Sequence, residues 1–475
     1  MKRFVLGALA FLSFACLTAA VGTKLFLVPQ LRVVPLDLDI TSVATTVPAD
    51  GQAGNRFPAT VFDRCSIRGK KAETFEAHLT QQRRSRIVEP SDRRQATIQS
   101  AQTVRIDRIR EGDGKESDPT MAKAGEERTC KDGLLNATVD RVSVSRRSSV
   151  PNGAVNSIQV EATPEDGKVS DVSVDAKRKG FQYKFGFNVK KRDYLYYDLT
   201  TRQDTRVKFV DEKVIDGVKT YHFQTEVPET DLSTLETPQG EAALGTMLTM
   251  PARWWGISGK GVKPGDKISM HRYASSTRHV WVEPQTGTIV DGREDQKQYF
   301  KSPDQTDDQP RAIREFTLPA LTATFQWNKE TSTEQAARAT KYMGQLKLGQ
   351  EKLPYILGGI GGLLLLLWLA GLYFTRGSQD AAAKKPAKSD DDATPAEGTP
   401  AVDDGPAPWE DEPATTVMST GVTTTGSVPI IVAPDPSAPT TAFGVPAVDD
   451  EHWHYNQHGQ YVADHEEPPA PPETR

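Results

Sequence analysis

The segment between positions 256 and 295 contains the residue types most often used in catalysis. Residues 256–260 (GISGK) place a serine and a lysine beside glycines, as nucleophile elbows and phosphate-binding loops do. The spacing fits neither motif, because no residue separates Ser258 from the second glycine and no Ser or Thr follows Lys260. The expected structure here is a turn that follows two tryptophans.

Acidic and imidazole side chains follow in the same segment. The run Asp291–Asp295 holds three carboxylates, and paired carboxylates can act as general acid and base. Arg293 lies among them, so a solvated turn explains the run equally well. His271 and His279 are too far apart for a helical metal pair, and each falls in a predicted strand. We therefore assign no catalytic residue, metal ligand or cofactor from these motifs.

The cysteines suggest a covalent link rather than catalysis. Cys65 and Cys130 lie in a segment that we expect outside the cytoplasm, where oxidising conditions favour pairing. A bridge over that span contributes about 4 kcal/mol in the chain-entropy treatment. Two buried free thiols are the alternative. The nearest histidine, His78, stands alone at no ligand-like spacing, so a metal site is not expected.

An uncharged stretch near the C-terminus is predicted to cross a membrane and so to place the preceding chain on one side of it. Leu353–Thr375 exceeds the about 20 apolar residues that a membrane helix needs, and Pro354 suits a first helical turn. Arg376 follows at once, and further lysines lie within the next 12 residues. By the positive-inside rule, the C-terminal side is predicted to be cytoplasmic.

A second apolar stretch begins the chain. Lys2 and Arg3 precede an uncharged run from Phe4 to Thr23, and a short apolar run continues to Val28. The length favours an uncleaved membrane helix, with a cleaved signal peptide as the alternative. In both cases the chain leaves the cytoplasm here and returns near residue 353, which leaves the segment between them outside.

The outer segment shows mainly β-type alternation. Asp216-Gly217 separates two alternating runs and indicates a hairpin. We expect an α+β fold whose antiparallel β domain forms a sandwich or half-barrel between two transmembrane helices. The expected strands are 194–199, 206–214, 219–227, 267–273, 278–283, 288–292 and 317–327.

Helical spacing occurs in two places of this outer segment. Ala243, Leu244 and Met247 suggest a short helix before residue 248. The stretch 333–352 fits better, with Ser332 or Thr333 as the cap, and would form a stalk that leads into the membrane.

Two glycines in the second membrane stretch suggest helix packing. Gly358 and Gly362 have small-xxx-small spacing, which lets another helix approach closely. The first helix of the same chain and a second copy are both candidate partners, and the second option would give a homo-oligomer. Frequent glycine in membrane helices is the simpler explanation.

The end of the chain differs in composition from the rest. After Lys388 no Lys or Arg occurs until Arg475, and Pro, Ala, Thr and Gly dominate. Such a segment buries too little apolar surface to offset ordering entropy, so a disordered acidic tail is expected. The whole chain has a net charge of −5, and no nucleic-acid partner is expected. The predicted divisions are 1–28, 29–332, 333–352, 353–375 and 376–475.

The order of several segments resembles a known family. The first apolar helix is followed by FLVPQLRVVPLDLDITSVA, RDYLYYDLTT, PARWWG and HVWVEPQTGTIVDGRE, and then by the last apolar helix. In this order they resemble actinobacterial membrane proteins of the PorA (porin) family, over residues 1–375. The resemblance implies a cell-envelope protein, and some relatives are linked to lipoglycan assembly. It supplies no catalytic residues.

The porin label can be compared with the sequence. A membrane barrel needs strands of about 9–11 residues with one lipid-facing side. The strands expected here are mostly shorter, and charged residues such as Arg206, Lys208 and Asp211 occupy both faces. We therefore expect no membrane barrel.

The remaining hypothesis is a binding function. We expect a non-catalytic accessory protein that binds membrane lipid or lipoglycan outside the cytoplasm and works beside other envelope-biosynthesis membrane proteins. A pore and an envelope hydrolase or transferase are the alternatives. Most aromatic residues are expected in the core, and a subset could line an apolar groove; they include Tyr183, Phe185, Phe187, Tyr194, Tyr196, Tyr197, Trp254, Trp255 and Trp281.

Overall fold

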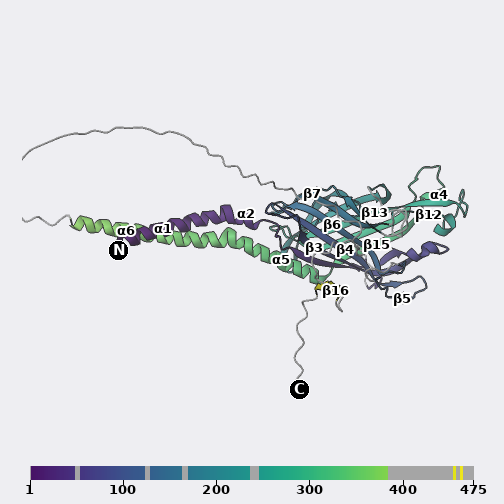
Figure 1. Cartoon of the computed structure of the whole chain (residues 1–475), viewed down its shortest axis with the longest axis horizontal. Coiled ribbons are helices and arrows are strands. Elements are labelled where there is room, and N and C mark those ends of the chain that lie inside the picture. The colour runs from purple at the N-terminus through teal and green to yellow at the C-terminus, as the bar shows by residue number, and fades with distance from the viewer. Residues whose placement is uncertain are drawn as a thin grey trace, which may run out of the picture. The chain divides into compact units, whose positions relative to one another are not determined.

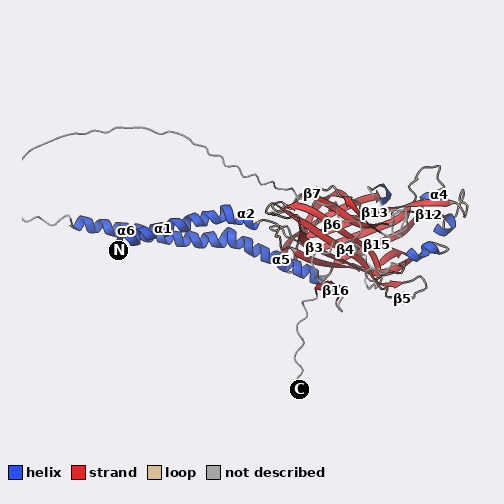
Figure 2. Cartoon of the chain, viewed as in Figure 1, coloured by secondary structure: helices blue, strands red, loops and turns tan. Residues whose placement is uncertain are grey.

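The computed structural model describes residues 2–48, 54–122, 129–162, 170–235, 245–382, 453–455 and 461–463. These residues fall into two compact units. One contains residues 2–10 and 364–382, and the other contains residues 11–363 and a short hairpin of β16 (Trp453–Tyr455) and β17 (Tyr461–Ala463). Figure 2 shows that strands make up most of the second unit. The predicted disorder of 376–475 falls mostly outside the described residues.

Antiparallel pairing joins the strands of the second unit into a 15-stranded sheet (Figure 1). This confirms the predicted antiparallel β domain between two apolar helices. Three short strands, β2 (Ala59–Phe62), β5 (Glu116–Ser117) and β12 (Met247–Pro251), pair beside the main order. In spatial order the others are β8 (Ser170–Asp175), β7 (Pro151–Ala162), β6 (Leu134–Ser145), β4 (Gln95–Arg110), β3 (Thr74–Val88), β1 (Asp39–Val47), β15 (Thr317–Trp327), β14 (Ile289–Lys301), β13 (Lys267–Val282), β11 (Val218–Asp231), β10 (Gln203–Ile215) and β9 (Tyr194–Asp198).

The chain just after β8 connects the two ends of this order. Ala176 N donates to Asn156 O on β7 at 2.9 Å. Phe181 N donates to Leu195 O on β9 at 2.8 Å, and Tyr197 N returns a bond to Phe181 O at 2.9 Å. The strands and residues 176–181 therefore form a closed ring, which we call the strand ring.

Several strands are longer than the sequence suggested. β3 has 15 residues, and β4 and β13 have 16 each. The expected strands 267–273 and 278–283 are one strand, because Ala274–Thr277 continue the ladder with β14. The expectation of short strands was wrong, since polar residues inside a strand resembled breaks. The Asp216-Gly217 turn is present, with φ of 46° and 79° as a type I′ turn requires.

One end of the strand ring is filled by an aromatic cluster. Trp254 and Trp255 lie in the short helix α3 (Ala252–Trp255) and pack against Phe62, Phe300 and neighbouring apolar residues. Gly256 ends this helix at φ 76°, so residues 256–260 form the predicted turn. We call this the far end of the strand ring.

The opposite end carries α5 (Lys329–Lys347), which follows β15 directly (Figure 1). Asn328 caps this helix, and its Oδ1 accepts a hydrogen bond from Thr331 N at 2.9 Å. The predicted caps at 332 and 333 were therefore wrong, and the helix begins earlier. Ala336, Ala339 and Met343 pack on the outside of the ring, against Trp281 and Val290 among others.

The short helix predicted before residue 248 is not present in the described residues of that segment. Met247 and Leu248 belong to β12, and only a 3₁₀ turn, η3 (Leu232–Thr234), precedes the gap. Residues 236–244 lie outside the described part of the chain.

Two helical segments are long and apolar enough to cross a membrane: Phe4–Leu31 and Lys329–Phe374. The first consists of α1 (Lys2–Gly22), η1 (Thr23–Leu27) and α2 (Val28–Leu31). In the second, a π-helical turn, η4 (Leu348–Lys352), joins α5 to α6 (Leu353–Ala382). The helix thus continues past residue 375, where the sequence had suggested its end.

Small residues of α6 allow close contact with α1. Within the larger unit, Ser13 Oγ donates to Gly361 O at 2.8 Å, and Leu17 packs over the same glycine. Gly358 and Gly362 face no atom that an added Cβ would approach within 4 Å. A side chain added at either position would therefore meet no atom of α1, and the packing of these two glycines against another helix stays a prediction.

A cysteine at position 361 is expected to form a disulfide with Cys16, which is free in the structure. A Cβ there would lie 3.2 Å from the Cys16 Cβ, close to disulfide spacing. Mild oxidation of membranes followed by peptide mapping should recover the link for Gly361→Cys and not for Gly358→Cys. An intermolecular link through Gly358→Cys would support self-association, and equal intrachain linkage in both variants would contradict this packing.

Candidate functional site

Polar side chains point into the strand ring as well as out of it. Along β3, Gln81 and Ser85 are buried on the inner side, with Arg83 between them. The alternate residues of β3, including His78, Gln82 and Arg84, therefore point outward. An outer face of this kind does not suit contact with lipid tails.

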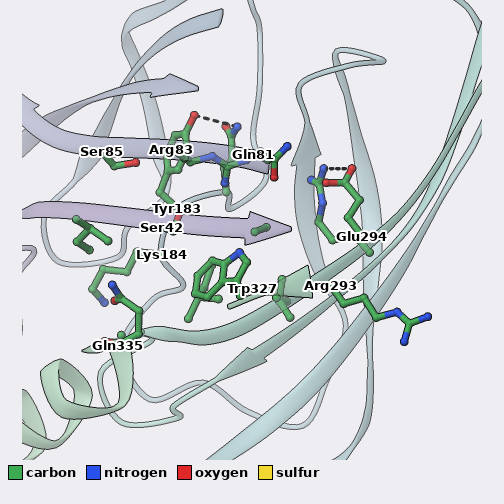
Figure 3. Close-up of a pocket in the computed structure, with 18 of the residues that line it drawn as sticks. Ser42, Gln81, Arg83, Ser85, Tyr183, Lys184, Arg293, Glu294, Trp327 and Gln335 are labelled. Carbon is green, nitrogen blue, oxygen red and sulfur yellow. Dashed lines mark hydrogen bonds and ion pairs between the residues drawn. The ribbon is translucent and has the colours of Figure 1, made fainter. Parts of the chain in front are cut away.

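A cavity of about 90 Å³ lies inside the ring at the α5 end (Figure 3). This volume is several times the 10–15 Å³ that one water needs by the same measure. Side chains from β1, β3, β13, β14, β15 and α5 line it, together with the connection before β9. The lining includes Ser42, Gln81, Arg83, Ser85, Gln182, Tyr183, Lys184, Tyr196, Arg278, Arg293, Glu294, Trp327, Gln335, Arg338 and Tyr342.

Among the charged residues of this lining, cations outnumber anions. Arg83, Lys184, Arg278, Arg293 and Arg338 contribute cations, whereas Glu294 is the single carboxylate among the lining residues. A cavity with this balance attracts anions and disfavours cations.

Arg278 is the most constrained of these cations. Its Nη2 lies 2.5 Å from Glu294 Oε1 and 3.2 Å from Asp198 Oδ2. Burial alone would lower the pKa of Arg278, but the charge of Glu294, with Tyr196 and Asp198, raises it above its ordinary value. Arg278 therefore stays charged, and its charge is largely balanced by the two carboxylates.

Lys184 is a buried ammonium without such a balance. Lys184 is only 8% exposed to solvent. Nζ donates to Phe185 O at 3.1 Å and to Thr286 O, and no carboxylate of the described residues pairs with it. Burial lowers the pKa of Lys184 to about 7, and the charge of Glu283 opposes this only in part.

This pKa predicts a pH-dependent stability. Below about pH 7 Lys184 is charged in both states, and its burial cost fully opposes folding. As pH rises from about 7 towards the model-peptide value of 10.5, the unfolded chain binds more protons, so the free energy of unfolding rises.

We expect Lys184→Met to remove about 1–2 kcal/mol of this rise between pH 7 and 8.5. Chemical denaturation in phosphate-free buffer measures it, with the exposed Lys190→Met as the control that keeps the rise. Parallel curves for wild type and Lys184→Met would contradict the expectation.

Gln335 reaches the same cavity from α5. It is 2% exposed, yet its Nε2 has no hydrogen-bond partner in the structure. Figure 3 shows Gln335 and Lys184 on the same side of the cavity. Arg338 and Tyr342 follow at helical spacing and line it too.

A second cavity of about 130 Å³ lies nearer the far end of the ring. Its lining is also polar, with Gln102, Gln296 and Gln298 beside Arg272. Gln81 lines both cavities. Polar residues therefore face the interior at both cavities, among apolar residues such as Val104 and Leu321.

A buried ion pair supports the wall beside the first cavity. Arg178 donates to both carboxylate oxygens of Asp140 at 2.6 and 2.8 Å, and both side chains are at most 1% exposed. Tyr183 Oη donates to Asp140 Oδ2 at 2.5 Å. Burial, followed by the charge of Asp140, raises the pKa of Tyr183. The pair fixes the closing segment of the ring and one cavity residue together.

The residues singled out in the sequence are dispersed. A disulfide joins Cys65 to Cys130, outside both cavity linings. Of the three carboxylates at 291–295, only Glu294 lines the first cavity, where it pairs with Arg278. His271 Nδ1 lies 2.8 Å from Asp231 Oδ2, so this histidine is hydrogen-bonded within its strand region.

The aromatic residues are mostly core, as expected. Tyr183 and Tyr196 line the first cavity, and they are joined by Trp327, which the sequence had not suggested. Apolar side chains such as Ile40, Val280 and Phe325 lie beside these rings, together with polar and cationic ones, and binding of an acyl chain by this set stays a prediction. Among the described residues, no group of three or more His, Cys, Asp or Glu could hold a metal ion.

The strand ring belongs to a chain with two helices that are long and apolar enough to cross a membrane, which is the layout of a membrane protein with a β domain. The family described as Porin PorA matches residues 7–370, and this chain belongs to that family, which confirms the resemblance. A Porin PorA of Corynebacterium amycolatum is 30% identical over 400 residues, covering 76% of this chain and 96% of the relative. A Porin PorA of Corynebacterium resistens is 29% identical over 422 residues, covering 78% and 96%.

Proposed function

We propose that this protein is a pore-forming protein of the cell envelope. The observation that carries the proposal is the set of polar side chains inside the strand ring, among which Gln81 lines two successive cavities. An interior of polar side chains suits water and small solutes. The relatives' name, Porin PorA, agrees with this function.

The membrane crossing in this proposal is made by helices. The outer face of the strand ring is polar, so the ring lies in water rather than in lipid. Two helices of one chain cannot enclose an aqueous passage, so several copies must contribute α1 and α6. Gly358 and Gly362 offer a face on which a neighbouring copy can pack.

Conductance of the purified full chain in planar bilayers tests the proposal. Gln81→Leu places an apolar group between the two cavities and should lower unit conductance at least twofold. Gln82→Leu changes the neighbouring outward residue and should leave conductance unchanged. Bilayers without conductance steps, or equal effects of both variants, would overturn the pore.

The orientation proposed for this pore puts the strand ring outside the cytoplasm and the C-terminal tail inside. The cations after the second apolar stretch support it. Cysteines introduced near Asp113 and near Asp404 should differ in intact cells, with only the first labelled by an impermeant reagent. If only the second position were labelled, the orientation would be the reverse of the one proposed.

Binding of membrane lipid or lipoglycan is the second candidate function. The small size of the cavities favours it, since volumes of about 90 and 130 Å³ suit a headgroup better than a continuous channel. With this second function, we propose that the partners of the protein are other membrane proteins of envelope biosynthesis. We propose no catalysis, because the carboxylate that lines the cavity is paired with Arg278.

A further inference from the structure

Three hydrogen-bond donors in the cavity at the α5 end have no acceptor. The Lys184 ammonium has three protons and donates to two backbone carbonyls, so one proton has no oxygen acceptor, although Nζ also lies 4.1 Å from the centroid of the Phe187 ring. Gln335 Nε2 and Arg338 Nε are buried and have no partner in the structure. Buried donors of this kind are costly unless something accepts from them.

The residues that carry these three donors line the same cavity. Gln335 and Arg338 are three residues apart and so occupy one face of α5. Lys184 comes from the connection before β9, on the same side of the cavity as Gln335 (Figure 3). The missing partner must therefore carry several acceptor atoms rather than one.

The charges of the lining select the kind of acceptor. Arg278 is balanced by Glu294 and Asp198, whereas Lys184 forms no ion pair among the described residues and feels only the charge of Glu283. Arg338 gives its Nη2 to a backbone oxygen, Asp39 O, at 3.1 Å. Lys184 and Arg338 thus form no ion pair among the described residues, and both line the same cavity.

We propose that this cavity binds a phosphate group through Lys184, Gln335 and Arg338. A phosphate carries several acceptor oxygens and negative charge, which matches three donors and two cations better than water does. The group is either inorganic phosphate or the phosphate of a lipid headgroup.

Access is available from the α5 side. Arg338 and Tyr342 are both partly exposed there while also lining the cavity. A headgroup can therefore enter beside α5, with the rest of a lipid remaining outside the strand ring. The site does not require the ring to conduct, so it can be tested independently of the pore.

Titration of the detergent-purified full chain with inorganic phosphate at constant ionic strength tests the site, with chloride as the reference anion. Calorimetry should show saturable binding at one site per chain. Lys184→Met should weaken it about tenfold or more, and Gln335→Leu by about threefold to tenfold. Lys190→Met removes an exposed cation of the same connection and should bind like wild type.

Native mass spectrometry of chain purified directly from membranes separates the two sources. A retained phospholipid mass that is lost in Gln335→Leu identifies a headgroup. Phosphate binding without retained lipid identifies the free anion. Gln335→Leu adds no charge and keeps the helix, so it remains informative if Lys184→Met fails to fold. Absence of both signals in wild type, or wild-type affinity in both variants, would overturn the site.

Discussion

Replacing Asp140 with alanine should destabilise the strand ring by about 3–5 kcal/mol. The substitution leaves the guanidinium of Arg178, which is fully buried, without its carboxylate partner. Tyr183 Oη also loses its acceptor. Breaking one side of a buried pair is costly because the remaining charge stays out of water. Urea denaturation followed by tryptophan fluorescence measures the change.

The control for this prediction is an aspartate in an exposed pair. Asp193 lies 3.5 Å from Arg206, and both side chains are largely in solvent. Asp193→Ala should change stability by less than about 0.5 kcal/mol. Similar losses in the two variants would mean that burial of the Asp140 pair is not the source of its stability.

Loss of the Cys65–Cys130 bridge should cost about 4 kcal/mol. The bridge closes a span of 65 residues, and the chain-entropy treatment gives this magnitude for a loop of that length. It also holds the 3₁₀ turn η2 (Arg64–Arg68) beside residues 129–133, where Arg64 Nη2 donates to Asp132 O at 2.6 Å. The double variant Cys65→Ser, Cys130→Ser should therefore unfold at lower urea.

The reducing agent provides the matched comparison. Reduction should lower the stability of wild type towards that of the double variant and leave the double variant unchanged. Peptide mapping without reduction should recover the linked pair from fresh protein. Two free thiols, or an equal response of both proteins to reductant, would contradict the prediction.

Local signals predicted the hairpins of this fold well. Asp216-Gly217 lies at a turn whose positive φ values only a few residue types accept, so the sequence marks it directly. The run Thr317–Trp327 was predicted at the bounds it has in the structure. β3 and β4 were harder, because polar residues on both faces resemble a solvated loop.

The cavity could not be predicted in the same way. Lys184 lies in an irregular connection, and Gln335 lies on a helix 151 residues later. Nothing near either residue indicates that the other lies beside it. The usable signal lies in β3, where Gln81 and Ser85 on one face and the alternate residues on the other face are both polar. This pattern is typical of a strand with water on its outer face and polar side chains on its inner face.

Closure of the strand ring by residues 176–181 also limits how this protein can meet others. An open sheet offers unpaired backbone groups on which a foreign strand can grow, as in amyloid and in peptide capture by β-augmentation. Here the backbone of Phe181 occupies those groups on β9, at Leu195 and Tyr197. A foreign strand therefore cannot pair with β9 at these two residues, and assembly there must use side chains and shape rather than shared backbone hydrogen bonds.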